Sequence, residues 1–209
     1  AGIITADEVA DAERMLPAAV FRELYLAEPS DDAGNPFGMD AIRARIAPMS
    51  TAAPAAWGVD LAKSVDWTVG VALDAGGAVC RLERFQRPWQ DTIRLLRDLL
   101  ADTPALIDST GVGDPVLEAL QQQRSTVQGF KFSAPSKQQL MEGLAVAIQQ
   151  GTVSYPDGVI VTELEQFEYA YTRTGVHYAC PEGAHDDAVS ALALAVKQAS
   201  RPSWDWGAV

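Results

Sequence analysis

The sequence contains little cysteine and few basic residues, and each scarcity excludes a class of protein. Two cysteines, Cys80 and Cys180, are too few for a disulfide framework or a zinc-ligand set. We expect them to be ordinary thiols in a reducing compartment. Only 16 Lys and Arg accompany 28 Asp and Glu, so the formal net charge is −12. This balance argues against a strong stand-alone nucleic-acid binder, because phosphate binding needs Lys and Arg.

Three further features are missing from the sequence. No apolar run reaches the roughly 18 residues that span a bilayer, so no membrane role is expected. The first residues lack the basic start and apolar block of a signal peptide, and the chain begins at Ala1, which fits a processed start or a cut-out fragment. No GxxxxGK[ST] phosphate-binding loop is present, so we expect no ATP hydrolysis.

The residues that are present indicate one packed domain and an appendage. Apolar residues make up 48% of 209 residues, which suits a folded core. Residues 1–52 show short helical patterns, beginning with a capping box at Thr5 and Glu8, and the small-residue stretch STAAPAA (50–56) spans the end of this segment. We therefore predict an N-terminal helical and linker segment over residues 1–52 and a separate domain over residues 53–209.

Alternating strands and helices follow from Trp57 onward. Residues 57–62 and 66–87 are typical of three strands, the last two joined by a turn at 74–77. Helices are predicted over 89–102, 111–123, 136–151 and 185–200, with strands at 104–110, 126–133 and 176–180; residues 158–173 fit a helix or a long strand. This order predicts an α/β fold whose mixed sheet has three antiparallel strands and then parallel ones, with helices on both faces.

Two aspartates occupy strand positions where an acid is unusual. Asp60 interrupts the apolar run WGVDLA, and a buried acid is costly unless it is paired or bound to a metal. Asp108 ends the apolar strand PALID before a glycine-rich turn, and ligands of open α/β sheets collect at the carboxyl ends of strands. Taken alone, each acid also fits an ordinary turn or helix cap.

A further acidic pair opens the last predicted helix. Asp186 and Asp187 follow His185 and precede an apolar stripe with many small residues, which would let the helix lie close to the sheet. Negative charge suits a helix N-terminus, so a capping role is the simpler interpretation. Together with Asp60 and Asp108, however, the pair could form a cluster of carboxylates. Such ligands favour Mg²⁺ or Mn²⁺, and two ions about 4 Å apart can cleave a phosphodiester.

Several basic side chains could assist such a site. His185 could orient a carboxylate or serve only a local hydrogen bond. Lys137, near the start of a predicted helix, could meet a phosphate, a site carboxylate or only solvent. Lys63 follows Asp60 and could contact a DNA backbone. Three arginines alternate with apolar residues and could form a basic strip or one solvated strand face: Arg81, Arg84 and Arg87.

Four segments of the chain, taken in order, resemble the nuclease domain of the large terminase subunit of tailed bacteriophages. They are GVDLAKSVDWTV (58–69), LIDSTGVGDPV (106–116), FSAPSKQQLMEGLAVAIQQGTVSYP (132–156) and HDDAVSALALA (185–195). The resemblance runs from about Trp57 to Ala199, and LPAAVFRELYLAEP (16–29) is similar to the piece that follows the ATPase domain in that family. It implies a ribonuclease H-like fold and two Mg²⁺ or Mn²⁺ ions bound by Asp60, Asp108 and one or both of Asp186 and Asp187.

The resemblance also implies a biological role. It predicts an endonuclease that cuts concatemeric viral DNA at the start and end of genome packaging, in the host cell cytoplasm and not as a virion component. The expected partners are double-stranded DNA and, in a full-length protein, an ATPase domain, the portal and the small terminase subunit. Alternatives are a Holliday-junction resolvase or transposase-like nuclease, and a non-catalytic module that binds packaging proteins.

Overall fold

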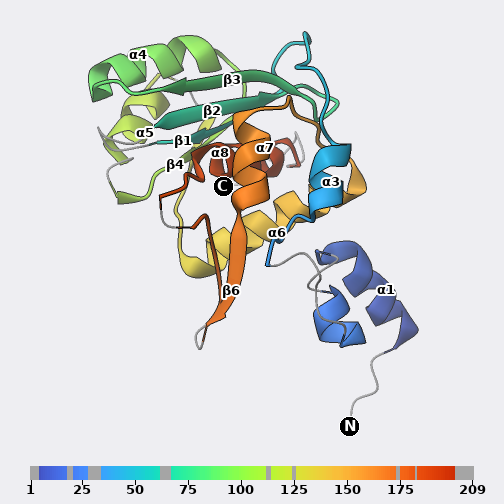
Figure 1. The fold of residues 1–209 in the computed structure, drawn as a ribbon. Coiled ribbons are helices and arrows are strands. Elements are labelled where there is room, and N and C mark those ends of the chain that lie inside the picture. Colours follow the sequence, from blue (N-terminus) through green and yellow to red (C-terminus); the bar gives the residue numbers. More distant parts are fainter. Residues whose placement is uncertain are drawn as a thin grey trace.

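A β-sheet lies between two layers of helices in the upper part of Figure 1. The computed structural model describes residues 5–17, 21–27, 34–61, 67–111, 114–123, 126–172, 175–181 and 183–200. Within these residues, a five-stranded sheet has the order β3-β2-β1-β4-β5. Its strands are β1 (Ala56–Asp60), β2 (Thr68–Leu73), β3 (Val79–Phe85), β4 (Ala105–Asp108) and β5 (Val127–Phe130).

The pairing of the strands confirms the predicted mixed sheet. β1 pairs antiparallel with β2, which pairs antiparallel with β3, while β4 lies parallel to both β1 and β5. The predicted turn between β2 and β3 is held by Asp74, whose Oδ1 accepts hydrogen bonds from Gly76 N at 2.8 Å and Ala78 N at 3.0 Å. As a result, β1, β3, β4 and β5 all run in one direction, and their carboxyl ends lie along one edge of the sheet.

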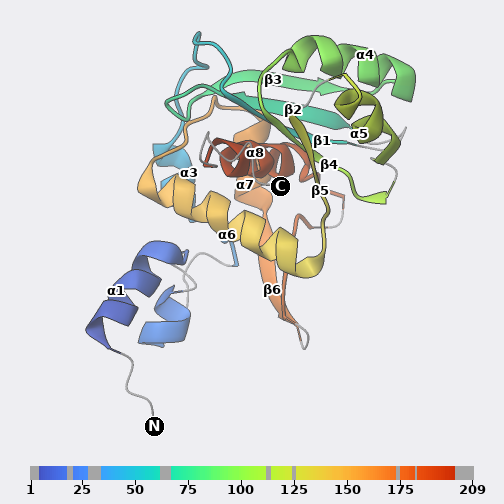
Figure 2. The same ribbon diagram turned by 180° about the vertical axis from the view of Figure 1, so that it is seen from behind.

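Helices cover both faces of the sheet (Figures 1 and 2). On one face lie α4 (Trp89–Leu100) and α5 (Asp114–Gln121), packed on a core that includes Val59 and Ile107. On the other face lie α3 (Met39–Ala44), α6 (Ala134–Gln150), α7 (Val159–Gln166) and α8 (Asp187–Ala199), packed on a core that includes Val69 and Leu106. Alternate residues of each strand therefore enter different cores, as the pleat requires.

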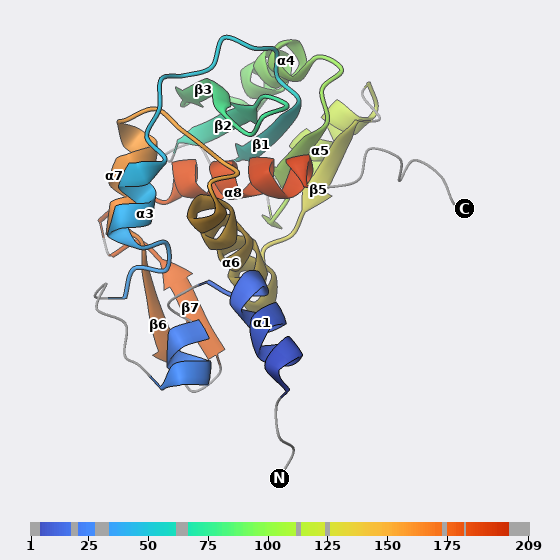
Figure 3. The same ribbon diagram turned by 90° about the vertical axis from the view of Figure 1, so that its right-hand side faces the viewer.

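Helix α8 lies unusually close to the sheet (Figure 3). A Cβ atom added at Gly58 would overlap the Ala191 carbonyl oxygen and the Ala195 nitrogen. The small residues of α8 were predicted to allow a close approach, and the glycine of β1 completes the fit. Because Gly58 and Asp60 are two residues apart on one strand, the Asp60 side chain also points to the α8 face.

The ambiguous segment 158–173 contains both kinds of structure. It forms α7 as far as Gln166, and then β6 (Glu168–Thr172) pairs antiparallel with β7 (Gly175–Ala179). This hairpin projects away from the central sheet (Figures 1 and 3). Phe167, fully buried between helix and strand, marks the change of conformation.

The described part of the N-terminal segment includes helices. It contains α1 (Ala6–Met15), η1 (Arg22–Leu26) and α3, and Thr5 and Glu8 form the expected capping box. Phe37 and Ile42 belong to the core beneath the sheet, so residues around α3 pack with the larger domain. The division at residue 52 stays a prediction. No helix among the described residues has both the length and the apolar character that a membrane crossing requires.

Candidate active site

Asp60 and Asp108 stand side by side at the carboxyl edge of the sheet. Val59 pairs with Ile107 across the parallel strands β1 and β4, and the two aspartates are the next residues along. Neighbouring strands lie about 4.8 Å apart, and paired positions point to the same face. Both carboxyl groups are therefore directed to the face that α8 covers.

The acidic pair Asp186 and Asp187 joins these two residues from α8. Asp186 occupies the N-cap position and Asp187 the first position of the helix. Both carboxylates lie near enough to Asp60 to raise its pKa by charge repulsion. Three elements that are distant in sequence thus bring together the four predicted acids: Asp60, Asp108, Asp186 and Asp187.

Burial makes the first two acids reluctant to ionise, and repulsion from neighbouring acids adds to this for Asp60. Burial is the largest cause that raises the pKa of Asp60 well above its ordinary value, followed by repulsion from Asp108, then from Asp187 and Asp186. Burial likewise raises the pKa of Asp108, although Thr110 N donates to its Oδ1 at 2.8 Å. A buried group of like charges needs a cation to remain ionised.

Lys137 brings a positive charge into this group. Its Nζ lies 2.8 Å from Asp186 Oδ2, and its charge opposes the rise in pKa of both Asp60 and Asp108. The local sequence explains its position. Ser133 and Ser136 form a capping box that starts α6 at Ala134, so Lys137 lies in the first turn and faces α8. Lys137 was expected to meet a phosphate, a site carboxylate or only solvent, and the structure shows it in contact with the carboxylate of Asp186.

His185 is beside the cluster, and its Nδ1 lies 3.7 Å from Asp187 Oδ2. Half of its side chain is exposed, so a direct role and a local contact are both compatible with its position. Lys63, the remaining predicted contact, lies outside the described residues.

The donor set fits hard divalent cations by charge and by chemistry. Four carboxylates with one ammonium group leave an excess of negative charge, and oxygen donors are those that Mg²⁺ and Mn²⁺ prefer. Among the described residues, no group of three or more His, Cys, Asp and Glu side chains stands close enough together to hold one metal ion. The acids are therefore gathered without a complete coordination shell.

The row of residues at the sheet edge continues to Arg84. Arg84 on β3 pairs with Val69 on β2, and Val69 pairs with Asp60 on β1, so all three point to the α8 face. The guanidinium group lies 4.3 Å from the centre of the Trp67 ring. Arg81 pairs instead with Ala72, which belongs to the core on the opposite face. The predicted common strand face is therefore wrong for Arg81 and Arg84, because residues three apart on a strand alternate faces. Arg87 follows the end of β3 and lies outside this comparison.

Sequence reasoning missed Glu163, a buried acid on α7. It is 4% exposed, and its Oε2 accepts hydrogen bonds from Ala188 N at 2.7 Å and Val189 N at 3.3 Å. Burial raises the pKa of Glu163 to about 7, while the two backbone donors oppose this rise. The available signal was its position on the apolar stripe of the helix, three residues after Ile160.

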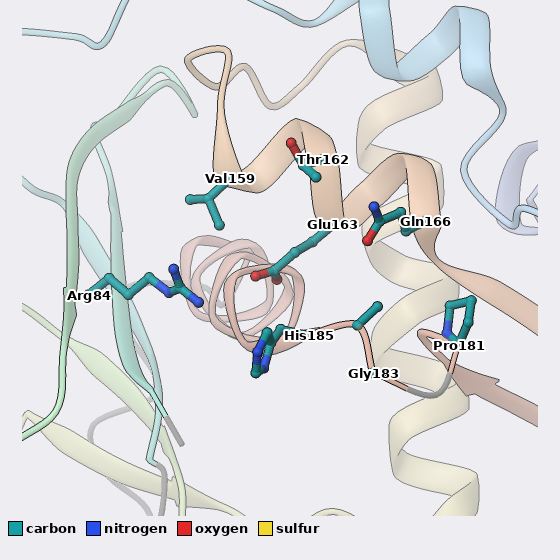
Figure 4. A pocket seen from close by; sticks show the side chains of 9 residues that line it. Arg84, Val159, Thr162, Glu163, Gln166, Pro181, Gly183 and His185 are labelled. Atoms are coloured by element: carbon teal, nitrogen blue, oxygen red, sulfur yellow. The ribbon is translucent and has the colours of Figure 1, made fainter. Parts of the chain in front are cut away.

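A pocket of about 600 Å³ opens between β3, α7 and the start of α8. Figure 4 shows Arg84 and Glu163 directed toward each other from opposite sides, with His185 below the end of α8. The remaining wall is formed mainly by residues of α7 and of the loop before α8, including Val159, Gln166 and Gly183. The pocket thus adjoins the acidic cluster on the side of β3.

Comparison with known proteins agrees with this geometry. A family model described as “Terminase RNaseH-like domain” matches residues 57–199. A search of curated proteins finds no match. The chain is similar to the crystal structure of the large terminase nuclease from thermophilic phage G20c, with a TM-score of 0.67 and 26% identity over 79% of this chain and 98% of that chain. The G20c nuclease with bound magnesium gives a TM-score of 0.67 and 27% identity over 77% and 96%.

Two further structures extend the comparison. The large terminase nuclease domain of Thermus phage P74-26 has a TM-score of 0.64 and 26% identity over 77% of this chain and 94% of that chain. The large terminase of another thermophilic bacteriophage has a TM-score of 0.66 and 12% identity over 92% of this chain and 52% of that chain, so it shows the fold alone. These similarities confirm the predicted ribonuclease H-like fold.

Proposed function

Because the chain belongs to the family of terminase RNaseH-like domains, we propose that it is a metal-dependent endonuclease that cuts concatemeric viral DNA during genome packaging. The single observation that carries this proposal is the gathering of Asp60, Asp108, Asp186 and Asp187 at the carboxyl edge of the sheet. Their repulsion is relieved by divalent cations, which a phosphodiester hydrolase of this kind requires.

Two Mg²⁺ or Mn²⁺ ions are the proposed cofactors. Support comes from the acidic donor set and from the G20c nuclease, which was crystallised with bound magnesium. When bound, the ions would supply an activated water and charge stabilisation for the leaving oxygen. Asp60, Asp108 and one or both of Asp186 and Asp187 would hold these ions.

The other polar residues have supporting roles in this proposal. Lys137 keeps Asp186 oriented and limits repulsion among the acids. His185 orients Asp187, and Lys63 contacts the DNA backbone. Arg84 binds a DNA phosphate beside the cleaved one, because it is a cation in the same row as Asp60, two strands away, on the same face.

The protein is proposed to act with partners in the host cell cytoplasm. Double-stranded DNA is the substrate, and an ATPase domain preceding residues 1–52, the portal and the small terminase subunit would bring it to the site. Such partners would offset the net charge of −12, which opposes independent DNA binding. The absence of ATP hydrolysis by this chain stays a prediction that a phosphate-release assay tests.

Cleavage of supercoiled plasmid tests the proposed activity. With Mn²⁺ or Mg²⁺, the chain should convert supercoiled DNA to nicked and linear forms, and chelation should stop it. Asp60→Asn should lower the rate by at least about a hundredfold, since a metal ligand is lost. Asp98→Asn is a matched control, because Asp98 is an exposed acid on α4 that pairs with Arg97.

The outcomes also separate the alternatives. Equal nicking by the wild type and Asp60→Asn would reject the assignment of the site. Cutting of branched DNA in preference to plain duplex would favour a resolvase-like nuclease. Failure of Mn²⁺ to raise the melting temperature, together with no cleavage, would favour a non-catalytic module that binds packaging proteins.

A further inference from the structure

Glu163 lies where an apolar residue would be expected. Its neighbours on α7, Ile160 and Leu164, are buried in the core beneath the sheet, and Glu163 itself is only 4% exposed. A buried carboxyl group destabilises a protein unless hydrogen bonds or charges compensate for its lost hydration. A specific partner must therefore account for its position.

That partner is the first turn of α8. Glu163 Oε2 accepts hydrogen bonds from the backbone nitrogens of Ala188 and Val189, at 2.7 and 3.3 Å. These are the second and third residues of the helix, whose N–H groups an N-cap side chain ordinarily satisfies. Glu163 thus caps α8 from another helix.

The residue at the N-cap position itself, Asp186, does not cap the helix. It makes no side-chain capping hydrogen bond, and its Oδ2 accepts instead from Lys137 Nζ at 2.8 Å. An aspartate at this position is normally well suited to capping. Because Glu163 satisfies the N–H groups, the Asp186 carboxylate can be directed to the acidic cluster.

We propose that Glu163 is a positioning residue of the nuclease site, which fixes the first turn of α8 and so holds Asp186 and Asp187 toward the bound ions. This inference rests on the proposed function. Glu163 does not touch the ions or the DNA in this arrangement. It acts through the backbone of Ala188 and Val189, and its carboxylate also suits the positive end of the helix dipole.

The second carboxyl oxygen of Glu163 distinguishes this positioning role from that of an ordinary stabilising cap. Glu163 Oε1 is buried and has no hydrogen-bond partner among the described residues. An unsatisfied buried acceptor lowers stability, and a serine or aspartate capping locally would avoid it. Capping by Glu163 therefore lowers the stability of the fold, but it leaves the Asp186 side chain free of a capping role.

Mn²⁺ binding by three variants tests the proposal. Glu163→Ala removes both acceptors, and Glu163→Asp shortens the side chain by one methylene while keeping its charge. Glu163→Gln retains an oxygen that can accept the same two hydrogen bonds. Ile160→Val is the control, since it removes one buried methyl group from the same helix without altering the cap.

Binding is measured by titration calorimetry at a temperature well below unfolding, where all variants are folded. A second measure is the Mn²⁺ concentration that gives half of the maximal rise in melting temperature. Glu163→Ala and Glu163→Asp should require at least about tenfold more Mn²⁺, as loss of a residue that supports metal ligands typically does. Glu163→Gln and Ile160→Val should stay within about threefold of the wild type. In plasmid cleavage, kcat should fall in the first two variants while KM for DNA changes less than about twofold.

The inference is overturned if Glu163→Ala needs no more Mn²⁺ than the wild type for half of the maximal rise in melting temperature. If the alanine variant does not fold, the same result for Glu163→Asp overturns it. Equal losses in Ile160→Val would also overturn it, because general destabilisation would then explain them. If the wild type itself neither binds Mn²⁺ nor cleaves DNA, the proposed function fails, and this inference fails with it.

Discussion

Lys137 donates a hydrogen bond from Nζ to Asp186 Oδ2 at 2.8 Å, and so ties the start of α6 to the start of α8. The same ammonium group opposes the rise in pKa of Asp60 and Asp108. It acts as a built-in cation within a group of acids that repel one another.

Replacing Lys137 should lower the stability of the metal-free protein but increase the stabilisation that Mn²⁺ brings. Lys137→Met should destabilise the metal-free protein by about 1 kcal/mol, since a partly exposed ion pair is lost. Its melting temperature should rise more on addition of Mn²⁺ than that of the wild type, because the cluster is more negative. Differential scanning calorimetry with and without Mn²⁺ measures both effects. Lys197→Met, at the other end of α8, should leave the Mn²⁺ response unchanged; an unchanged response in Lys137→Met as well would contradict the prediction.

Two glycine substitutions should have opposite effects. Gly58→Ala makes a Cβ overlap the Ala191 carbonyl oxygen, so α8 must move away from β1. Gly58→Ala should lower the free energy of unfolding by about 1–3 kcal/mol or more. The melting temperature should fall by about 2–4 °C for each kcal/mol lost. Cleavage should be lost because Asp187 is displaced together with α8. Gly143→Ala meets no atom within 4 Å and lies inside α6, so it should stabilise by about 0.5–1 kcal/mol. Thermal unfolding of the two variants side by side checks this; a stable, active Gly58→Ala protein would show that the close contact is not required.

Arg84 and Arg81 offer a matched test of DNA contact. Both are on β3 and each carries one positive charge, but only Arg84 points to the α8 face. Arg84→Ala should raise KM for plasmid DNA and reduce the slope of log affinity against log salt by about one, as expected for one lost phosphate contact. Arg81→Ala should leave both close to the wild type. Equal effects of the two substitutions would indicate long-range attraction and not a contact.

The stability of the metal-free protein should depend on pH through Glu163. Its pKa is raised from 4.5 to about 7 in the folded protein, so the folded state binds the proton more tightly than the unfolded state does. The contribution of this group to stability is therefore favourable at low pH and is lost as pH rises from about 4.5 to about 7. Denaturant unfolding at pH 4 and pH 8, without metal, should show that Glu163→Gln gains stability relative to the wild type at the higher pH. A constant difference between the two proteins would reject the shift.

The order of elements and the mixed sheet could be predicted from sequence because each strand and helix has a local pattern. The capping box at Thr5 and the turn at Asp74 depend on residues within four positions, and both are present. Asp60 and Asp108 stood out because an acid at the end of an apolar strand is unusual. Their adjacency depends on strand order, which the resemblance to a known family implied.

The remaining features depend on contacts that no local pattern contains. The sequence around Glu163 gives no sign of its target, since the N–H groups that donate to it lie 25 and 26 positions later. Segment 158–173 was ambiguous because α7 and β6 are both short and follow each other directly, with the change of conformation at the buried Phe167. The arginines of β3 were misassigned because strand register determines the face to which each one points.

The deep contact between Gly58 and α8 bears on when activity can arise during protein synthesis. β1 and β4 leave the ribosome long before the helix that begins at Asp187, and two of the four acids arrive only with that helix. A nascent chain that ends before α8 would lack both these carboxylates and the helix that buries the sheet. Under the proposed function, translation of α8 would thus be the step that completes the acidic cluster and makes DNA cleavage possible.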